Sequence, residues 1–165
     1  MSTGLKNQLT KQIGEHLAVA ELGRRGIIAT PFAGNVPDID ILAYANNKTL
    51  PIQIKAINQT SWQFDIRNFL DIRLTKKGQF VKGKKQGINR KIICIFIVIE
   101  SSDKRNDEFY ILRLGWLQNY FHQRYKGRKQ PQNINSFHCA IWKKDLKTYL
   151  NNWKLIENRF GLSVL

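Results

Sequence analysis

Four polar side chains stand where packing alone would favour hydrocarbon, and together they could carry metal-assisted hydrolysis. Asp40 opens an apolar run, and Gln53 and Lys55 interrupt the next run two residues apart. Glu15 lies further upstream, in a segment with helical spacing. Carboxylate and amide oxygens suit Mg²⁺, a hard cation that can polarise a phosphodiester and lower the pKa of a bound water. A neighbouring lysine can stabilise negative charge in the transition state.

A predicted β-hairpin would bring three of these residues together. The two apolar runs flank an Asn46-Asn47 turn, which favours antiparallel pairing. A turn centred near residue 47 pairs Asp40 with about position 54, within reach of Gln53 and Lys55. A slip of one residue would instead turn Asp40 to the opposite face of the sheet.

A predicted helix from Leu9 to Arg25 would bring Glu15 over the same end of the hairpin. Gly26 follows directly and supplies a C-terminal stop. Because the helix is apolar on two sides, we expect other elements to cover both sides rather than leave one exposed. The two stripes are Leu9, Ile13, Leu17 and Ala20, and Val19 with Leu22.

The remaining pattern predicts one α/β domain over residues 1–165, with a central mixed β-sheet flanked by helices. Residues 92–99 are almost wholly apolar, which is typical of a central strand covered on both faces. We expect a loop at 33–35, weaker strands at 62–66 and 71–75, and a basic loop from Lys76 to Lys85. Further expected elements are a strand at 108–114, a helix at 116–124, a strand at 137–141, and a closing helix through Leu146, Leu150 and Trp153.

The chain is strongly basic, because its 165 residues carry 27 Lys and Arg against 12 Asp and Glu, a formal net charge of +15. An apolar content of 42% excludes a disordered chain. A polyphosphate is the partner that this charge favours most, since each phosphate that a Lys or Arg neutralises releases a condensed counterion. An acidic membrane is disfavoured because we find no amphipathic helix or lipid motif; a solvated face that serves solubility remains an alternative. The predicted phosphate contacts are Lys76, Lys77, Lys82, Lys84, Lys85, Arg124, Lys126, Arg128 and Lys129.

Cysteine usage and the chain ends indicate a cytoplasmic protein without zinc or disulfides. Cys94 and Cys139 lie in apolar or alternating runs, so we expect both to be small buried side chains. The N-terminal residues lack the apolar core of a signal peptide, and no stretch is long and apolar enough to span a membrane.

At Glu15, Asp40 and the Gln53–Lys55 tripeptide the chain resembles the PD-(D/E)XK nuclease superfamily. The matching segments are Glu15 in GEHLAVAELGRRG, Asp40 in PDIDILA and Gln53-Ile54-Lys55 in PIQIKA. Gln53 replaces the usual acidic residue of the tripeptide, as in the intron-encoded homing endonucleases of cyanobacterial type, which the chain also resembles. The first helix is similar to the opening helix of archaeal junction resolvases. The resemblance covers roughly residues 10–57.

The resemblance implies a restriction-endonuclease-like fold and a Mg²⁺-dependent DNA endonuclease, with Mn²⁺ able to replace Mg²⁺. Glu15, Asp40 and Gln53 would hold the metal, Lys55 would be the catalytic lysine, and Asp38 is a possible auxiliary ligand. Double-stranded DNA would be the substrate. Since cutting both strands requires two active sites, we expect a homodimer or homotetramer. Two alternatives remain open: an inactive nuclease fold that only binds nucleic acid, and an interaction protein with an acidic partner.

Overall fold

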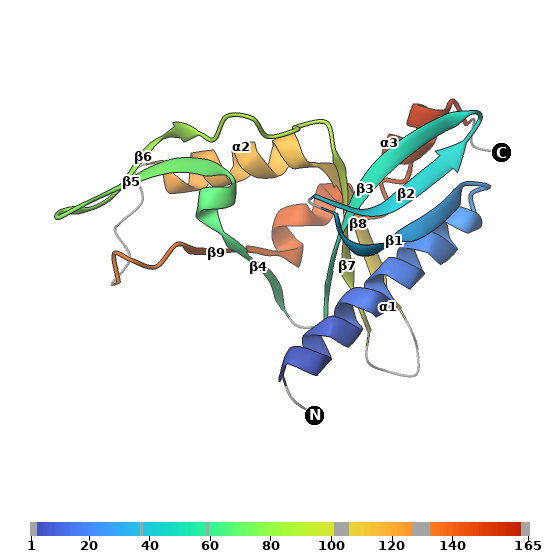
Figure 1. The fold of residues 1–165 in the computed structure, drawn as a ribbon, viewed down its shortest axis with the longest axis horizontal. Helices are drawn as coiled ribbons and strands as arrows, with labels where there is room; N and C mark the ends of the chain where they lie inside the picture. Colours follow the sequence, from blue (N-terminus) through green and yellow to red (C-terminus); the bar gives the residue numbers. More distant parts are fainter. Residues whose placement is uncertain (1–2, 37, 59, 101–105, 127–132, 163–165) are drawn as a thin grey trace.

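A five-stranded mixed sheet forms the centre of the protein (Figure 1), as described by a computed structural model for residues 3–36, 38–58, 60–100, 106–126 and 133–162. The strand order is β1-β2-β3-β7-β8, in which β3 and β7 are parallel and the other neighbours are antiparallel. The predicted mixed α/β fold is therefore confirmed. The strands are β1 (Ile28–Val36), β2 (Ile39–Ala45), β3 (Lys48–Ile57), β7 (Ile93–Val98) and β8 (Glu108–Arg113).

The β2–β3 hairpin has the predicted turn. Asn46 and Asn47 both have positive φ, 46° and 58°, and they connect Ala45 to its partner Lys48. Such a two-residue turn matches the twist of a hairpin, and asparagine tolerates the left-handed conformation better than most residues. Ile41 pairs with Ile52, so extending the register by one residue places Asp40 opposite Gln53.

Helix α1 (Thr3–Gly23) crosses the sheet on the β1–β3 side (Figure 1), and only some of its buried residues are the predicted ones. Gly14, Ala18 and Leu22 are buried, whereas Leu9 and Ile13 are 38% and 45% exposed. The expectation that both apolar stripes are covered is therefore wrong. The reason is steric: a Cβ on Gly14 would lie 2.3 Å from the Ala56 Cβ, so the helix lies closer to β3 than larger side chains permit.

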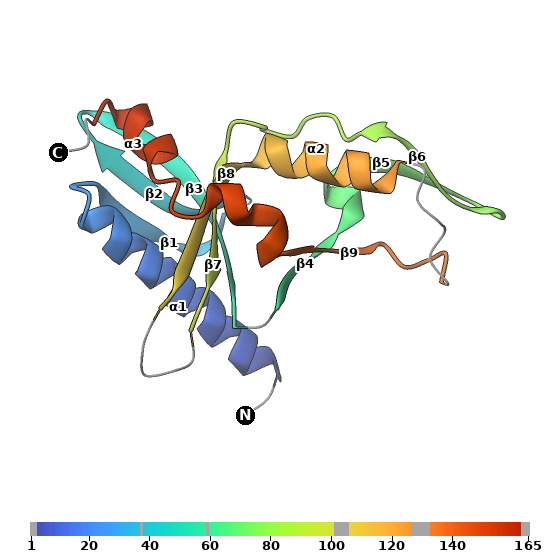
Figure 2. The ribbon, with the colours of Figure 1, turned by 180° about the vertical axis from the view of Figure 1, so that it is seen from behind.

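Two apolar clusters lie on opposite faces of the sheet, and β7 supplies side chains to both. Ile93, Ile95 and Ile97 pack with α1 and with α3 (Lys154–Phe160), which lies in front of β2 and β3 in Figure 2. Cys94 and Phe96 face α2 (Leu114–Tyr125) and a small sheet of β4 (Ser61–Asp65) and β9 (His138–Trp142). The prediction that this strand is covered on both faces is confirmed.

Three predicted segments are wrong. The expected loop at 33–35 is part of β1, and the expected closing helix is a 3₁₀ helix, η2 (Lys143–Tyr149), followed by α3, with Leu150 exposed between them. Most of the expected basic loop is β6 (Gly78–Lys84), which pairs with β5 (Leu70–Thr75). These two strands form a ribbon that projects away from the central sheet (Figure 1), and the short 3₁₀ helix η1 (Ile66–Asn68) leads into it.

Both cysteines are buried, as predicted, with 1% exposure for Cys94 and 2% for Cys139. In the part of the chain that the structure describes, no helix is long and apolar enough to cross a membrane.

Candidate active site

Close packing of α1 on β3 brings Glu15 to the sheet. Gly14 lies directly against Ala56, and Glu15 follows it in the helix. Only 15% of the Glu15 side chain is exposed, as is 15% of the Asp40 side chain. The missing side chain at Gly14 therefore lets a helix-borne carboxylate approach the hairpin.

Lys11 lies between these two carboxylates. Its Nζ is 3.6 Å from Glu15 Oε1, one helical turn away, and 3.3 Å from Asp40 Oδ1. The Asp40 carboxylate is also fixed to β3, because its Oδ2 accepts a hydrogen bond of 2.8 Å from the backbone N–H of Ile54. The helix and the hairpin thus share one cluster of charges.

The pKa values of the cluster reflect burial and mutual charge. Burial raises the pKa of Glu15, and the Asp40 carboxylate adds to this effect, although the Lys11 ammonium partly opposes it. Burial alone would lower the pKa of Lys11, but the Asp40 and Glu15 carboxylates outweigh it and raise that pKa. Each charge in the cluster therefore depends on its neighbours.

Gln53 and Lys55 lie on the same face of β3 as predicted, beside Cys94 of β7. Gln53 is paired with Cys94 in the parallel register, and the Cys94 thiol donates to Gln53 Oε1 across 3.7 Å. An amide oxygen has two lone pairs, so Oε1 can still bind a cation. Burial raises the pKa of the Cys94 thiol to about 12. The charge of Lys55 lowers this pKa and the charge of Asp40 raises it.

Lys55 lines two cavities. One, of about 280 Å³, is lined by Lys11, Asp40 and Lys55. The other, of about 450 Å³, is lined by Asp38, Gln53, Lys55 and Lys85 among others. Asp38 is exposed and has a positive φ of 62°. The structure thus brings Glu15, Asp40, Gln53 and Lys55 to one region, with Asp38 on its second cavity.

The donor set fits a hard divalent cation in its chemistry. Two largely buried carboxylates already share one positive charge, the Lys11 ammonium, and an amide oxygen lies on the neighbouring strand. Oxygen donors of this kind suit Mg²⁺, which usually takes one or two carboxylates and keeps several waters. Within the described residues, no three His, Cys, Asp or Glu side chains form a group that could hold a metal ion.

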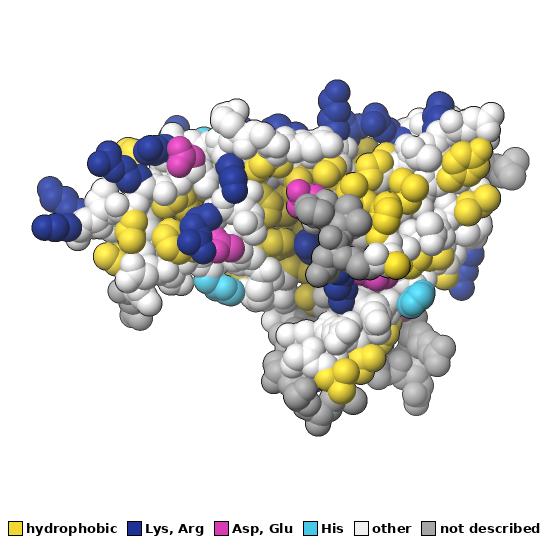
Figure 3. Space-filling model, viewed as in Figure 1, with side chains coloured by type: hydrophobic (Ala, Val, Ile, Leu, Met, Phe, Trp, Pro, Cys, Tyr) yellow, Lys and Arg dark blue, Asp and Glu magenta, His cyan; other side chains and the backbone are white. Residues whose placement is uncertain are grey.

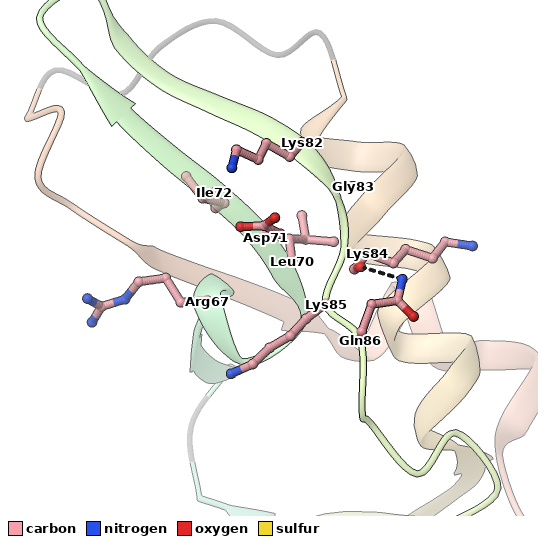
Figure 4. A pocket seen from close by; sticks show the side chains of 9 residues that line it. All are labelled: Arg67, Leu70, Asp71, Ile72, Lys82, Gly83, Lys84, Lys85 and Gln86. Atoms are coloured by element: carbon pink, nitrogen blue, oxygen red, sulfur yellow. Dashed lines mark hydrogen bonds between the residues drawn. The ribbon is translucent and has the colours of Figure 1, made fainter.

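Basic side chains continue from this site toward the ribbon, where Lys and Arg gather (Figure 3). Lys85 lines both the cavity of Lys55 and a further cavity of about 560 Å³ with Arg67 and Lys82. In Figure 4, Lys84 extends away from Lys82 and Lys85. The β5–β6 register is shifted next to Lys82, and such a bulge changes the direction of side chains.

The other predicted phosphate contacts are scattered. Lys76 and Lys77 form the turn at the tip of the ribbon. Arg124 donates to the Tyr120 hydroxyl and lies over the Trp142 ring, so its charge is partly engaged. Lys126 follows the end of α2 and is exposed, whereas Arg128 and Lys129 lie outside the described residues.

Two residues at the site were not among the sequence predictions. Lys11 precedes Glu15 by four residues, a spacing at which oppositely charged helical side chains meet, so this contact could have been anticipated. Arg67 follows an expected strand, but its place in the cavity with Lys82 depends on the ribbon, which the sequence pattern did not reveal.

No protein-family model matches the sequence, and no curated protein matches it either. The structure is similar to that of the bacterial homing endonuclease I-Ssp6803I, with a TM-score of 0.54 and 13% sequence identity, over 93% of this chain and 95% of that chain. At this identity the similarity concerns the fold. The mixed α/β architecture around a five-stranded sheet is therefore a fold shared with a homing endonuclease.

Proposed function

We propose that the protein is a Mg²⁺-dependent endonuclease that hydrolyses phosphodiester bonds of double-stranded DNA. The observation that carries this proposal is the cluster of Glu15 and Asp40 around one positive charge, with Lys55 lining the same cavity as Lys11 and Asp40. The fold shared with a homing endonuclease supports it.

Each residue of the site has a role in this proposal. The Glu15 and Asp40 carboxylates and the Gln53 amide oxygen hold the cation, and Asp38 is an auxiliary ligand. When bound, the cation supplies Lewis-acid polarisation of the phosphodiester and lowers the pKa of a bound water. Lys55 neutralises negative charge that develops on the phosphate oxygens during hydrolysis. Mn²⁺ is expected to replace Mg²⁺, since both favour carboxylate ligands.

The basic cavities supply the contacts that hold DNA. Because Lys85 lines both the cavity of Lys55 and that of Arg67 and Lys82, one phosphate backbone could follow these residues from the site to the ribbon. Such contacts position the substrate but carry no sequence information themselves. Cutting both strands needs two active sites, so we propose a homodimer or homotetramer as the active form.

The proposal is tested by plasmid cleavage and binding measured side by side. Wild-type protein is expected to nick or linearise plasmid in Mg²⁺, and this cleavage should stop when EDTA is added. Lys55→Met should reduce cleavage at least about 100-fold while DNA affinity stays within a few-fold, because the lysine acts on the transition state. Lys48→Met is the matched control, since it removes the same charge from the opposite end of β3 and should cut normally.

A second candidate function follows from Gln53, which brings an amide where the superfamily pattern has a carboxylate. An amide lacks negative charge and holds a cation less firmly, so the fold could bind DNA without cutting it. Binding without cleavage in Mg²⁺ and in Mn²⁺ would favour this function. If cleavage then appears in Gln53→Glu, the missing charge is the cause. A gel shift that fails even at low salt would instead favour an acidic protein partner.

A further inference from the structure

Lys11 occupies the place between Glu15 and Asp40 where a divalent cation would bind. Its Nζ lies 3.6 Å from one carboxylate and 3.3 Å from the other. Two carboxylates this near a common point repel each other unless a positive charge lies between them. The Lys11 ammonium provides that charge in the metal-free protein.

We propose that Lys11 is an internal counter-ion that competes with the divalent cation for the Glu15–Asp40 pair and thereby sets the metal affinity. The inference rests on the proposed function, because it concerns the same metal site. It assigns Lys11 a positioning role: its ammonium neutralises the repulsion between the two carboxylates before the metal binds, and it must leave when the metal arrives.

The carboxylates are held in place, whereas Lys11 is free to leave. Asp40 is fixed by the Ile54 N–H, and Glu15 is carried by the helix at its tight contact between Gly14 and Ala56. The Lys11 side chain is 53% exposed and has a flexible stem, so its ammonium can turn into solvent at small cost. Lys11 also lines the cavity of Lys55, so the displaced ammonium has open space beside the carboxylates to enter.

Neutralising Lys11 should therefore tighten metal binding. The cation no longer has to displace an ammonium, and one positive charge near the site is lost. For a partly exposed pair the gain is about tenfold in Kd, which corresponds to about 1.4 kcal/mol. Without metal, the same variant should have a lower Tm than the wild type, because the two carboxylates then face each other uncompensated. With metal added, the variant should have the higher Tm of the two.

The test is a calorimetric titration of Mn²⁺ into metal-free protein, together with Tm measured in EDTA and in Mn²⁺. Wild type is compared with Lys11→Met, with Lys11→Arg, which keeps the charge, and with Lys6→Met. Lys6 is exposed on the same helix, so its replacement removes the same charge without touching the pair. We expect about tenfold tighter binding in Lys11→Met and changes of less than about threefold in the other two variants.

The possible results separate this inference from the proposed function. If wild type and variants all fail to bind Mn²⁺, the metal site is absent and both fall. If wild type binds and Lys11→Met binds equally well or more weakly, the counter-ion role is overturned and the proposed function stands. An equal gain in Lys6→Met would show a general charge effect and would also overturn the role of Lys11.

Discussion

Gly14→Ala should damage the site without touching any charged residue. The new Cβ would lie 2.3 Å from the Ala56 Cβ, and carbon atoms need about 3.5–4.0 Å, so α1 and β3 must separate by about 1.5 Å. Overpacking of this kind costs about 1–3 kcal/mol, whereas alanine gains about 1 kcal/mol over glycine within a helix. Because the forced shift is large, we expect a net loss of about 2 kcal/mol in unfolding free energy.

The same shift moves Glu15, the next residue in the helix, away from Asp40. A displacement of about 1 Å at a catalytic group can reduce the rate about 100-fold. Denaturant unfolding measures the loss of stability, and plasmid cleavage under conditions where the variant is fully folded measures the loss of rate. Both should fall together in Gly14→Ala.

Two further variants show whether the close contact is the cause. Gly23→Ala places the same methyl group on the same helix with no atom within 4 Å, so it should keep full activity and gain up to about 1 kcal/mol. In Gly14→Ala/Ala56→Gly the nearest remaining atoms are Ile54 Cγ2 at 3.6 Å and the residue 56 Cα at 3.7 Å, which are ordinary contacts. Cleavage should therefore return. Full activity in Gly14→Ala alone, or no rescue in the double variant, would refute the packing argument.

Three other predictions concern charge and burial. Lys82→Ala should make the slope of log Kd for DNA against log salt shallower by about one, whereas Lys154→Ala on α3 should leave it unchanged. Burial would raise the pKa of Glu108, but hydrogen bonds from Lys143 and a tyrosine outweigh it and lower that pKa. The pair of Glu108 and Lys143 therefore stabilises the protein fully above the ordinary pKa of 4.5, and this stability is lost as the pH falls through the lowered pKa of Glu108 in the folded protein. Lys143→Met should therefore cost up to about 1 kcal/mol at pH 7, and progressively less as the pH falls below 4.5, in thermal unfolding. The thiol of Cys94 is 1% exposed with its pKa raised to about 12, so Ellman's reagent should react with it only after denaturation.

The β2–β3 hairpin could be predicted because its determinants are local. Asn46 and Asn47 favour a two-residue turn, and the alternation of apolar side chains fixes which face each strand presents. With the turn known, the shared face of Gln53 and Lys55 follows from the two-residue period of a strand. The geometry of Asp40 therefore required only a count of residues.

The exposed elements could not be predicted in the same way. In α1 the larger residues Leu9 and Ile13 suggested the buried face, but contact with β3 selects the small Gly14 and Ala18 because they allow close approach. Strand β6 is rich in lysine and glycine, since much of it faces solvent and its partner is the hairpin strand β5. A ribbon of this kind lacks the apolar alternation by which strands are recognised.

The central claim, that a helix and a hairpin bring Glu15, Asp40 and Gln53 to one metal site, is tested most directly by anomalous diffraction from crystals grown with Mn²⁺. We predict one strong peak at coordination distance from oxygens of these three side chains, with the Lys11 ammonium turned away. A peak bound elsewhere, or none between the two carboxylates at saturating Mn²⁺, would contradict it.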